Sequence, residues 1–176
     1  MEFKAVRLID IQQVRMWRNE WMQALRTPFM LTKEMQDDYY YDVICDRQSN
    51  SRMWAVWTDN KECTPRFVGI AGLLNIEWEN GLAEISVMID PELRSYGYGK
   101  RIIHKLLEKG FDELRLENIY GECYYCNHAH HFWEVLAKRY KGKMVDLPNR
   151  KFYNGEYHDS LYFNINKEDF YGADNT

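Results

Sequence analysis

The fold is decided by the stretch Ala83-Glu84-Ile85-Ser86-Val87-Met88-Ile89-Asp90-Pro91-Glu92-Leu93-Arg94-Ser95-Tyr96-Gly97-Tyr98-Gly99-Lys100. Its apolar first half predicts a buried strand, and an amphipathic helix follows its end. Glycines in the loop between them allow a tight turn and the close approach of a ligand. Because free N–H groups at a helix start favour an anion, the stretch predicts a cradle for a phosphate or pyrophosphate. A plain strand-to-helix turn is the alternative interpretation.

The rest of the chain predicts alternating helices and strands around this stretch. Asp10, with Gln13 as its capping-box partner, predicts a helix to about Arg26, and a second helix is expected from Thr32 to about Cys45. Strands are expected at 53–57, 67–76, 82–89 and 119–125, helices from 100 and at about 127–138, and a last hairpin at Asn154-Gly155. We therefore expect one α/β (α+β) domain over residues 1–176, with a flexible tail of about eight residues.

Composition and charge exclude several classes of protein. Hydrophobic residues make up 45% of the 176 residues, unlike a disordered chain. With 23 basic and 27 acidic residues the net charge is -4, which does not favour nucleic acid as a partner. No apolar run approaches the roughly 20 residues of a membrane-spanning helix, and charges from Glu2 to Asp10 interrupt any secretory signal. We expect a cytoplasmic protein without membrane contact. Its cysteines are expected to be thiols: Cys45, Cys63, Cys123 and Cys126.

The pattern Arg94-x-x-Gly97-x-Gly99, between a strand and a helix, resembles the acyl-CoA pyrophosphate loop of the GNAT superfamily of N-acetyltransferases. The order of the elements is similar to that fold over nearly the whole chain. The resemblance implies a central mixed, largely antiparallel twisted sheet flanked by helices, two strands that splay apart at the cofactor site, and acetyl-CoA (coenzyme A) as cofactor. Neither a Walker loop nor a dinucleotide-binding pattern is present.

The resemblance also assigns cofactor-binding residues. The pyrophosphate loop comprises Arg94, Ser95, Tyr96, Gly97, Tyr98, Gly99 and Lys100, the pantetheine-binding strand Val87, Met88 and Ile89, and the start of the later helix Asn127. Splaying leaves backbone groups of the strand unpaired, and a peptide-like pantetheine would satisfy them.

Acetyl transfer needs a neutral amine, a donor that polarises the thioester carbonyl and a route for the proton. Glu84 is the candidate for orienting or deprotonating the amine; a strand carboxylate paired with an arginine is the structural alternative. Trp133 stands where many family members have a tyrosine that protonates the departing thiolate, and an indole N–H cannot serve as that acid. Tyr124 is therefore the first candidate, with Tyr125 or a water as alternatives.

The family motif around Asn127 also departs from its usual spacing. When Phe132-Trp133-Glu134 is aligned with the aromatic pair and glutamate of the family, Cys126 falls where the asparagine is expected, and Ala129 replaces a frequent serine. Cys123-x-x-Cys126 beside three histidines invites a zinc interpretation. The strand would place the two cysteines on opposite faces, so we expect no metal.

The first helix suggests the acceptor. Trp17-Arg18-Asn19 and the following Arg26 resemble residues of acetyltransferases that act on nucleotide-linked aminosugars. Arg18 and Arg26 could bind a phosphate or carboxylate, with Asn19 beside them, or lie solvated on the surface. The ending Phe152–Leu161 resembles both that group and the ribosomal-protein N-terminal acetyltransferases.

Together these features predict an acetyl-CoA-dependent N-acetyltransferase in which a small primary amine, such as a nucleotide-linked aminosugar, attacks the thioester directly. A protein N-terminal acetyltransferase and a non-catalytic acyl-CoA-binding module are the alternatives, and a homodimer is expected from the resemblance alone.

Overall fold

The computed structural model describes residues 1–59 and 64–174, so Cys63 lies outside the described residues. In this part of the chain seven strands form one sheet in the order β1-β2-β3-β4-β5-β7-β6. The strands are β1 (Glu2–Lys4), β2 (Arg52–Trp57), β3 (Phe67–Glu77), β4 (Leu82–Ile89), β5 (Asn118–Tyr124), β6 (Lys143–Tyr153) and β7 (Glu156–Asn166). Among the described strands only β4 and β5 pair in parallel, and all other neighbours are antiparallel. The predicted mixed, largely antiparallel sheet is confirmed.

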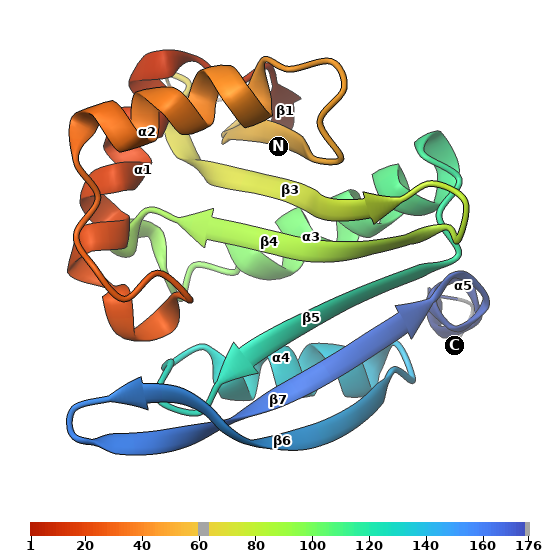
Figure 1. The fold of residues 1–176 in the computed structure, drawn as a ribbon. Coiled ribbons are helices and arrows are strands. Elements are labelled where there is room, and N and C mark those ends of the chain that lie inside the picture. Colours follow the sequence, from red (N-terminus) through yellow and green to blue (C-terminus); the bar gives the residue numbers. More distant parts are fainter. Residues whose placement is uncertain (60–63, 175–176) are drawn as a thin grey trace.

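Strands β4 and β5 splay apart. Their parallel register covers only Leu82–Glu84 against Asn118–Tyr120, and beyond it the two ribbons diverge into a V (Figure 1). The rest of β4 pairs with β3 along one edge, while its other edge has no strand partner within the described residues. The splay inferred from the resemblance is therefore present, and it leaves backbone groups of Val87–Ile89 open on the β5 side.

Helices cover both faces of the sheet. α1 and α2 lie on one face, and α3 and α4 lie on the other (Figure 1). The helices are α1 (Leu8–Glu20), α2 (Lys33–Tyr39), α3 (Tyr98–Glu108), α4 (His130–Arg139) and α5 (Lys167–Asp174), with short helical turns η1 (Met22–Ala24), η2 (Tyr40–Ile44), η3 (Pro91–Leu93) and η4 (Lys109–Glu113). The segment after α1 reaches the open side of the V, where the site is formed.

The ends of α1 differ from the sequence prediction. Arg7 is the N-cap residue, and the Asp10 carboxylate, three positions later, accepts a hydrogen bond from the Arg7 backbone N–H at 2.9 Å. The helix ends at Glu20 rather than near Arg26, because the chain tightens into η1. The predicted start of α2 is confirmed, since the Thr32 hydroxyl accepts from the Met35 N–H at 3.2 Å.

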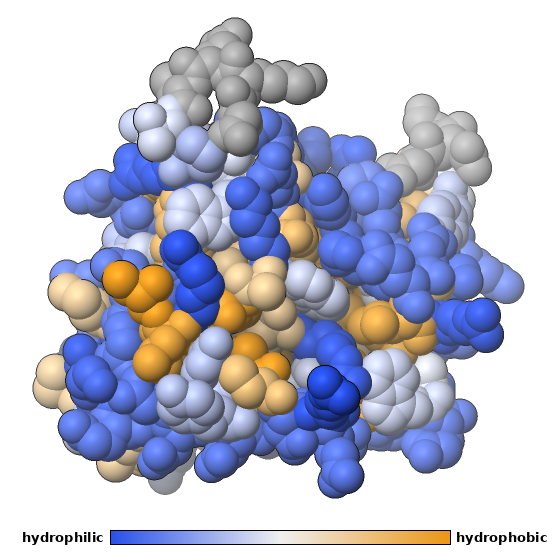
Figure 2. Space-filling model, turned by 90° about the horizontal axis from the view of Figure 1, so that it is seen from above, coloured by the Kyte–Doolittle hydropathy of each residue, from blue (hydrophilic) through white to orange (hydrophobic). Residues whose placement is uncertain are grey.

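Two apolar clusters hold the layers together. One lies between the sheet and α3, α4 and α5, and the other lies under α1. Figure 2 shows the molecule from above. Hydrophilic side chains cover most of the surface seen in this view, and apolar side chains form small groups between them. Within the described residues, no helix is long and apolar enough to cross a membrane.

The prediction of a flexible C-terminal tail is wrong for the residues up to Asp174. Residues 167–174 form α5, and Phe170 is fully buried, with its ring 5.5 Å from that of Phe111 and 5.1 Å from that of Tyr140. One buried aromatic ring in a short polar segment gives little periodic signal, which is why the sequence did not reveal the helix. The strand β1 was missed as well, because three residues are too few to show a periodic pattern.

Phe170→Ala is expected to lower the free energy of unfolding by about 3–5 kcal/mol, because it removes a fully buried ring and leaves a cavity. Urea unfolding followed by circular dichroism measures this change. Glu168→Ala, at an exposed position of the same helix, is the control and is expected to change it by less than about 0.5 kcal/mol. Equal small effects from both variants would mean that α5 is not docked.

Candidate cofactor groove and acidic cluster

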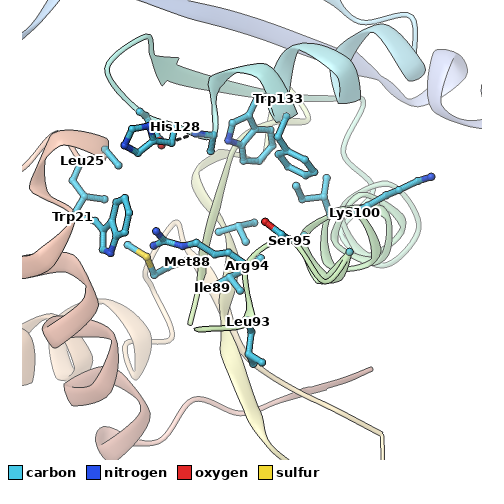
Figure 3. Close-up of a pocket in the computed structure, with 18 residues that line it drawn as sticks. Trp21, Leu25, Met88, Ile89, Leu93, Arg94, Ser95, Lys100, His128 and Trp133 are labelled. Atoms are coloured by element: carbon cyan, nitrogen blue, oxygen red, sulfur yellow. Dashed lines mark hydrogen bonds between the residues drawn. The ribbon is translucent and has the colours of Figure 1, made fainter. Parts of the chain in front are cut away.

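A groove of about 570 Å³ lies where β4 and β5 diverge (Figure 3). Its lining comes from four segments far apart in the sequence. These are Trp21, Ala24 and Leu25 after α1; Val87, Met88 and Ile89 on β4; Leu93, Arg94, Ser95, Gly97, Gly99, Lys100 and Ile103 in the loop and α3; and Asn127, His128, Ala129, Phe132 and Trp133 before and in α4. The groove is largely apolar, with a basic, glycine-rich wall, which suits a ligand that has both an apolar part and a phosphate group.

The glycine loop presents backbone N–H groups to the groove. Gly97 is the N-cap residue of α3, with φ of 77°, and no side chain of the described residues caps this helix start. A Cβ added at Gly97 would meet nothing within 4 Å, so the left-handed backbone, rather than lack of space, requires glycine. At Gly99 a Cβ would approach Phe132 to 3.3 Å and narrow the groove. The arrangement is an open anion cradle at a helix N-terminus.

Most residues predicted to bind the cofactor meet in this groove. The ones that line it are Val87, Met88, Ile89, Arg94, Ser95, Gly97, Gly99, Lys100 and Asn127. Tyr96 and Tyr98 do not line it: Tyr96 is 75% exposed and Tyr98 packs against the apolar core. The side chains of Tyr96 and Tyr98 point away from the groove, because successive residues in a turn direct their side chains to different sides. Binding by the lining residues stays a prediction.

Arg94 lies across the groove toward α1. Its guanidinium sits 3.9 Å from the centre of the Trp21 ring, a cation–π contact visible in Figure 3. Burial lowers the pKa of Arg94. Trp21 also meets the ring of His128 edge-on, with the two centroids 6.0 Å apart. Trp21 and His128, neither of which was predicted as a site residue, therefore form the wall opposite the glycine loop.

Two carboxylates lie side by side on β4 and β5, on the sheet face that α1 covers. We call Glu84, Glu122, Arg26 and Arg150 the acidic cluster. Glu84 binds Arg26 at 2.8 and 3.0 Å and accepts from the Asn75 amide at 3.0 Å. Glu122 binds Arg26 at 3.1 Å and Arg150 at 2.9 Å, and it accepts from a serine hydroxyl at 2.7 Å. The carboxylate–arginine pairing considered as the alternative for Glu84 is therefore present.

The charges of the acidic cluster shift neighbouring groups. Burial alone would lower the pKa of Arg26, but the hydrogen bond and charge of Glu84 raise it above its ordinary value. Burial opposes ionisation of Glu122, yet hydrogen bonds from Arg150 and Ser160 lower its pKa. Burial and the charge of Glu122 raise the pKa of Tyr124, so its phenol stays protonated. The acidic cluster thus holds Glu122 ionised beside a proton donor.

The three predicted acceptor residues are used differently. Arg26 belongs to the acidic cluster, so its fork faces carboxylates rather than an open anion site. The Asn19 amide is engaged on both sides by the Leu31 backbone, at 2.8 and 3.0 Å. Arg18 donates to the Thr27 hydroxyl at 3.2 Å, and burial lowers its pKa. Asn19 and Arg18 therefore hold the segment after α1 in place, and any acceptor contact by them stays a prediction.

The candidate acids lie outside the groove. Tyr124 does not line it and lies on the side of the acidic cluster, while the Tyr125 hydroxyl donates to Asp146. Trp133 lines the groove and stacks on Phe163 at 5.1 Å. Glu122 was not predicted as a site residue. The sequence did offer a signal for it, because Tyr120, Glu122 and Tyr124 alternate along β5 and so Glu122 shares one face of the strand with the candidate acid Tyr124.

The two cysteines at the end of β5 are free thiols in different surroundings. Cys123 is buried in β5, where burial raises the pKa of its thiol to about 12, and the Cys126 thiol donates to the Gln23 carbonyl at 3.4 Å. In residues 1–59 and 64–174 no three His, Cys, Asp or Glu side chains are grouped as metal ligands.

Comparison with known families identifies the class of protein. The family described as "Acetyltransferase (GNAT) domain" matches residues 1–131, about three quarters of the chain. The chain therefore belongs to the GNAT family and is an acetyl-CoA-dependent N-acetyltransferase. No curated protein sequence matches the chain.

Solved structures similar to this chain include spermidine N-acetyltransferases. One from Vibrio cholerae in complex with CoA and spermine has 21% identity, a TM-score of 0.82 and 97% coverage of both chains. A chimera of Vibrio cholerae SpeG and hSSAT has 22% identity, a TM-score of 0.80 and the same coverage. A dodecameric structure of the Vibrio cholerae enzyme has 22% identity, a TM-score of 0.74 and coverage of 96% of this chain and 95% of that chain. These similarities confirm the fold, and the aminosugar or ribosomal-protein branch stays a prediction.

Proposed function

We propose that this enzyme acetylates a small, positively charged primary amine. The observation that carries the proposal is the acidic cluster, in which two nearly buried carboxylates lie on β4 and β5 where the pairing of these strands ends. Carboxylates attract ammonium groups, and the spermidine N-acetyltransferases of the same fold act on such amines. A nucleotide-linked aminosugar is less well supported, because the Arg26 guanidinium that was to bind its phosphate is committed to Glu84 and Glu122.

The groove fits acetyl-CoA along its length. We assign the pyrophosphate to the start of α3, where Gly97 and Gly99 leave N–H groups open and Lys100 adds positive charge. The pantetheine arm would pair with the unpaired edge of β4 at Val87–Ile89, as an added strand. Asn127 lines the far wall, where its side chain accepts from the Ala129 N–H at 2.9 Å and so shapes the entry to α4.

The reaction is proposed to be a direct attack without a covalent enzyme intermediate. When bound, the thioester supplies the activated acetyl group. Glu84 orients the amine and takes its proton, directly or through a water. Open backbone N–H groups on β4 polarise the thioester carbonyl. The raised pKa of Tyr124 keeps its phenol protonated, so Tyr124 could supply a proton to the departing thiolate. Because its side chain does not line the groove, the proton would pass through a water.

Acetyl-CoA is expected to raise the melting temperature of the wild type, because a ligand that binds only the native state adds about 2.7 kcal/mol of stability at 100 times its Kd. Arg94→Ala is expected to lose most of this shift, since it removes a cation from the groove. Arg101→Ala, a neighbouring cation that does not line the groove, is the control and should keep it. A folded wild type that does not respond to acetyl-CoA would contradict the cofactor assignment.

An amine panel separates the remaining alternatives. The panel contains a diamine, a monoamine, an aminosugar nucleotide and a peptide with a free N-terminus. Transfer to the peptide alone would establish the N-terminal acetyltransferase, and binding of acetyl-CoA without transfer to any amine would establish the non-catalytic module. The homodimer stays a proposal from the family resemblance.

A further inference from the structure

The Arg26 guanidinium lies where a cationic ligand of Glu84 and Glu122 would bind. It lies between Glu84 and Glu122 and contacts both carboxylates at 2.8 to 3.1 Å. The arginine side chain is 54% exposed, whereas the Glu84 and Glu122 side chains are only 11% and 6% exposed. The carboxylates are thus held inside the protein, and the cation that neutralises them reaches in from the surface.

The backbone just before Arg26 is held at two points. The Lys151 ammonium donates to the Leu25 carbonyl at 2.6 Å, and the Cys126 thiol donates to the Gln23 carbonyl at 3.4 Å. The guanidinium can therefore leave the carboxylates by rotation of the side chain, without movement of the segment. Without Arg26, Glu84 loses its ion pair while Glu122 keeps the one with Arg150. A buried carboxylate without its cation is unfavourable, so a second cation must replace the guanidinium.

Aromatic rings border the acidic cluster. Tyr120 and Tyr162 stack at 5.6 Å on the same side, and the charge of Glu84 adds to burial in raising the pKa of both hydroxyls. The faces of such rings attract ammonium groups. A cation that enters beside Glu84 would thus meet carboxylates and neutral aromatic rings.

Resting on the proposed function, we infer that Arg26 occupies the place of the acceptor's cationic groups and that Glu122 receives a second, non-reacting ammonium of that acceptor. The reacting nitrogen then meets Glu84, and the guanidinium turns out to solvent. A diamine can replace both contacts of Arg26, whereas a monoamine can replace only one. Arg26 and Glu122 are therefore specificity-determining residues, and the acceptor class is a diamine or longer polyamine.

The test compares KM values for 1,4-diaminobutane and n-butylamine at saturating acetyl-CoA. Arg26→Ala is expected to lower the KM for the diamine about fivefold or more, because the competing cation is gone, and to lower it less for the monoamine. Glu122→Gln is expected to raise the ratio of diamine KM to monoamine KM about tenfold, since it removes one charge-assisted contact. Arg47→Ala, at an exposed position, makes the same change in net charge and should alter neither KM.

Several outcomes would overturn the inference. An unchanged or raised diamine KM in Arg26→Ala, with both amines still acetylated, would show that Arg26 does not compete with the acceptor, while the proposed function would stand. If Arg26→Ala does not fold, Arg26→Lys decides, because its single ammonium cannot bridge both carboxylates and the diamine KM should still fall. If the wild type acetylates neither amine, the proposed function fails. Calorimetric titration of 1,4-diaminobutane into wild type and variant then tests the inference separately, and equal affinities would overturn it.

Discussion

Glu84→Gln is expected to lower kcat about 100-fold or more while the KM for acetyl-CoA changes less than about twofold, because a positioned general base contributes roughly 10²–10⁴ to the rate. Glutamine keeps the shape of the side chain and can still accept a hydrogen bond from Asn75, but it cannot take a proton from the amine. Steady-state kinetics with 1,4-diaminobutane measure the change.

Two observations separate catalysis from structure at Glu84. The rate of the variant should rise steeply with pH, as the amine loses its proton in solution without help. Glu79→Gln, an exposed glutamate in the turn between β3 and β4, is the matched control and should behave as the wild type. A kcat of Glu84→Gln within about threefold of the wild type across the pH range would reduce Glu84 to an ion-pair partner of Arg26.

Gly97→Asp is expected to weaken acetyl-CoA binding about 100-fold or more and yet leave the protein folded. Aspartate tolerates the left-handed backbone at this position better than most residues, and a Cβ here meets nothing within 4 Å. Its carboxylate would cap the free N–H groups of α3 and repel the phosphates that we assign to them. Isothermal titration calorimetry gives the affinity, and circular dichroism checks the fold.

Gly97→Asn is the control for charge, because it has nearly the same shape and capping ability. We expect it to bind more weakly than the wild type but clearly more tightly than Gly97→Asp. Wild-type affinity in both variants would mean that the pyrophosphate does not lie at the start of α3.

The part of the site that one short segment forms could be predicted from the sequence. Gly97 and Gly99 lie at the start of α3, where the conformation and the exposed N–H groups depend on residues close in the chain, so the cradle followed from local rules. Tyr96 and Tyr98 belong to the same motif, but only the path of the backbone decides that their side chains leave the groove. The tail fails for a related reason, since α5 owes its place to the burial of Phe170 between elements far away in the sequence.

The sequence by itself determined the order of the elements from α1 to β7, the glycine loop and the GNAT resemblance, because periodicity, turn residues and helix starts are local properties of the chain. Only the tertiary structure decided what surrounds the reacting centre. Arg26 and Glu84 are 58 residues apart, and Arg26 and Glu122 are 96 apart, and no local rule pairs side chains over such distances. Their contact follows from the short parallel pairing of β4 and β5, which places Glu84 and Glu122 near each other where the pairing ends, and from the segment after α1, which reaches both.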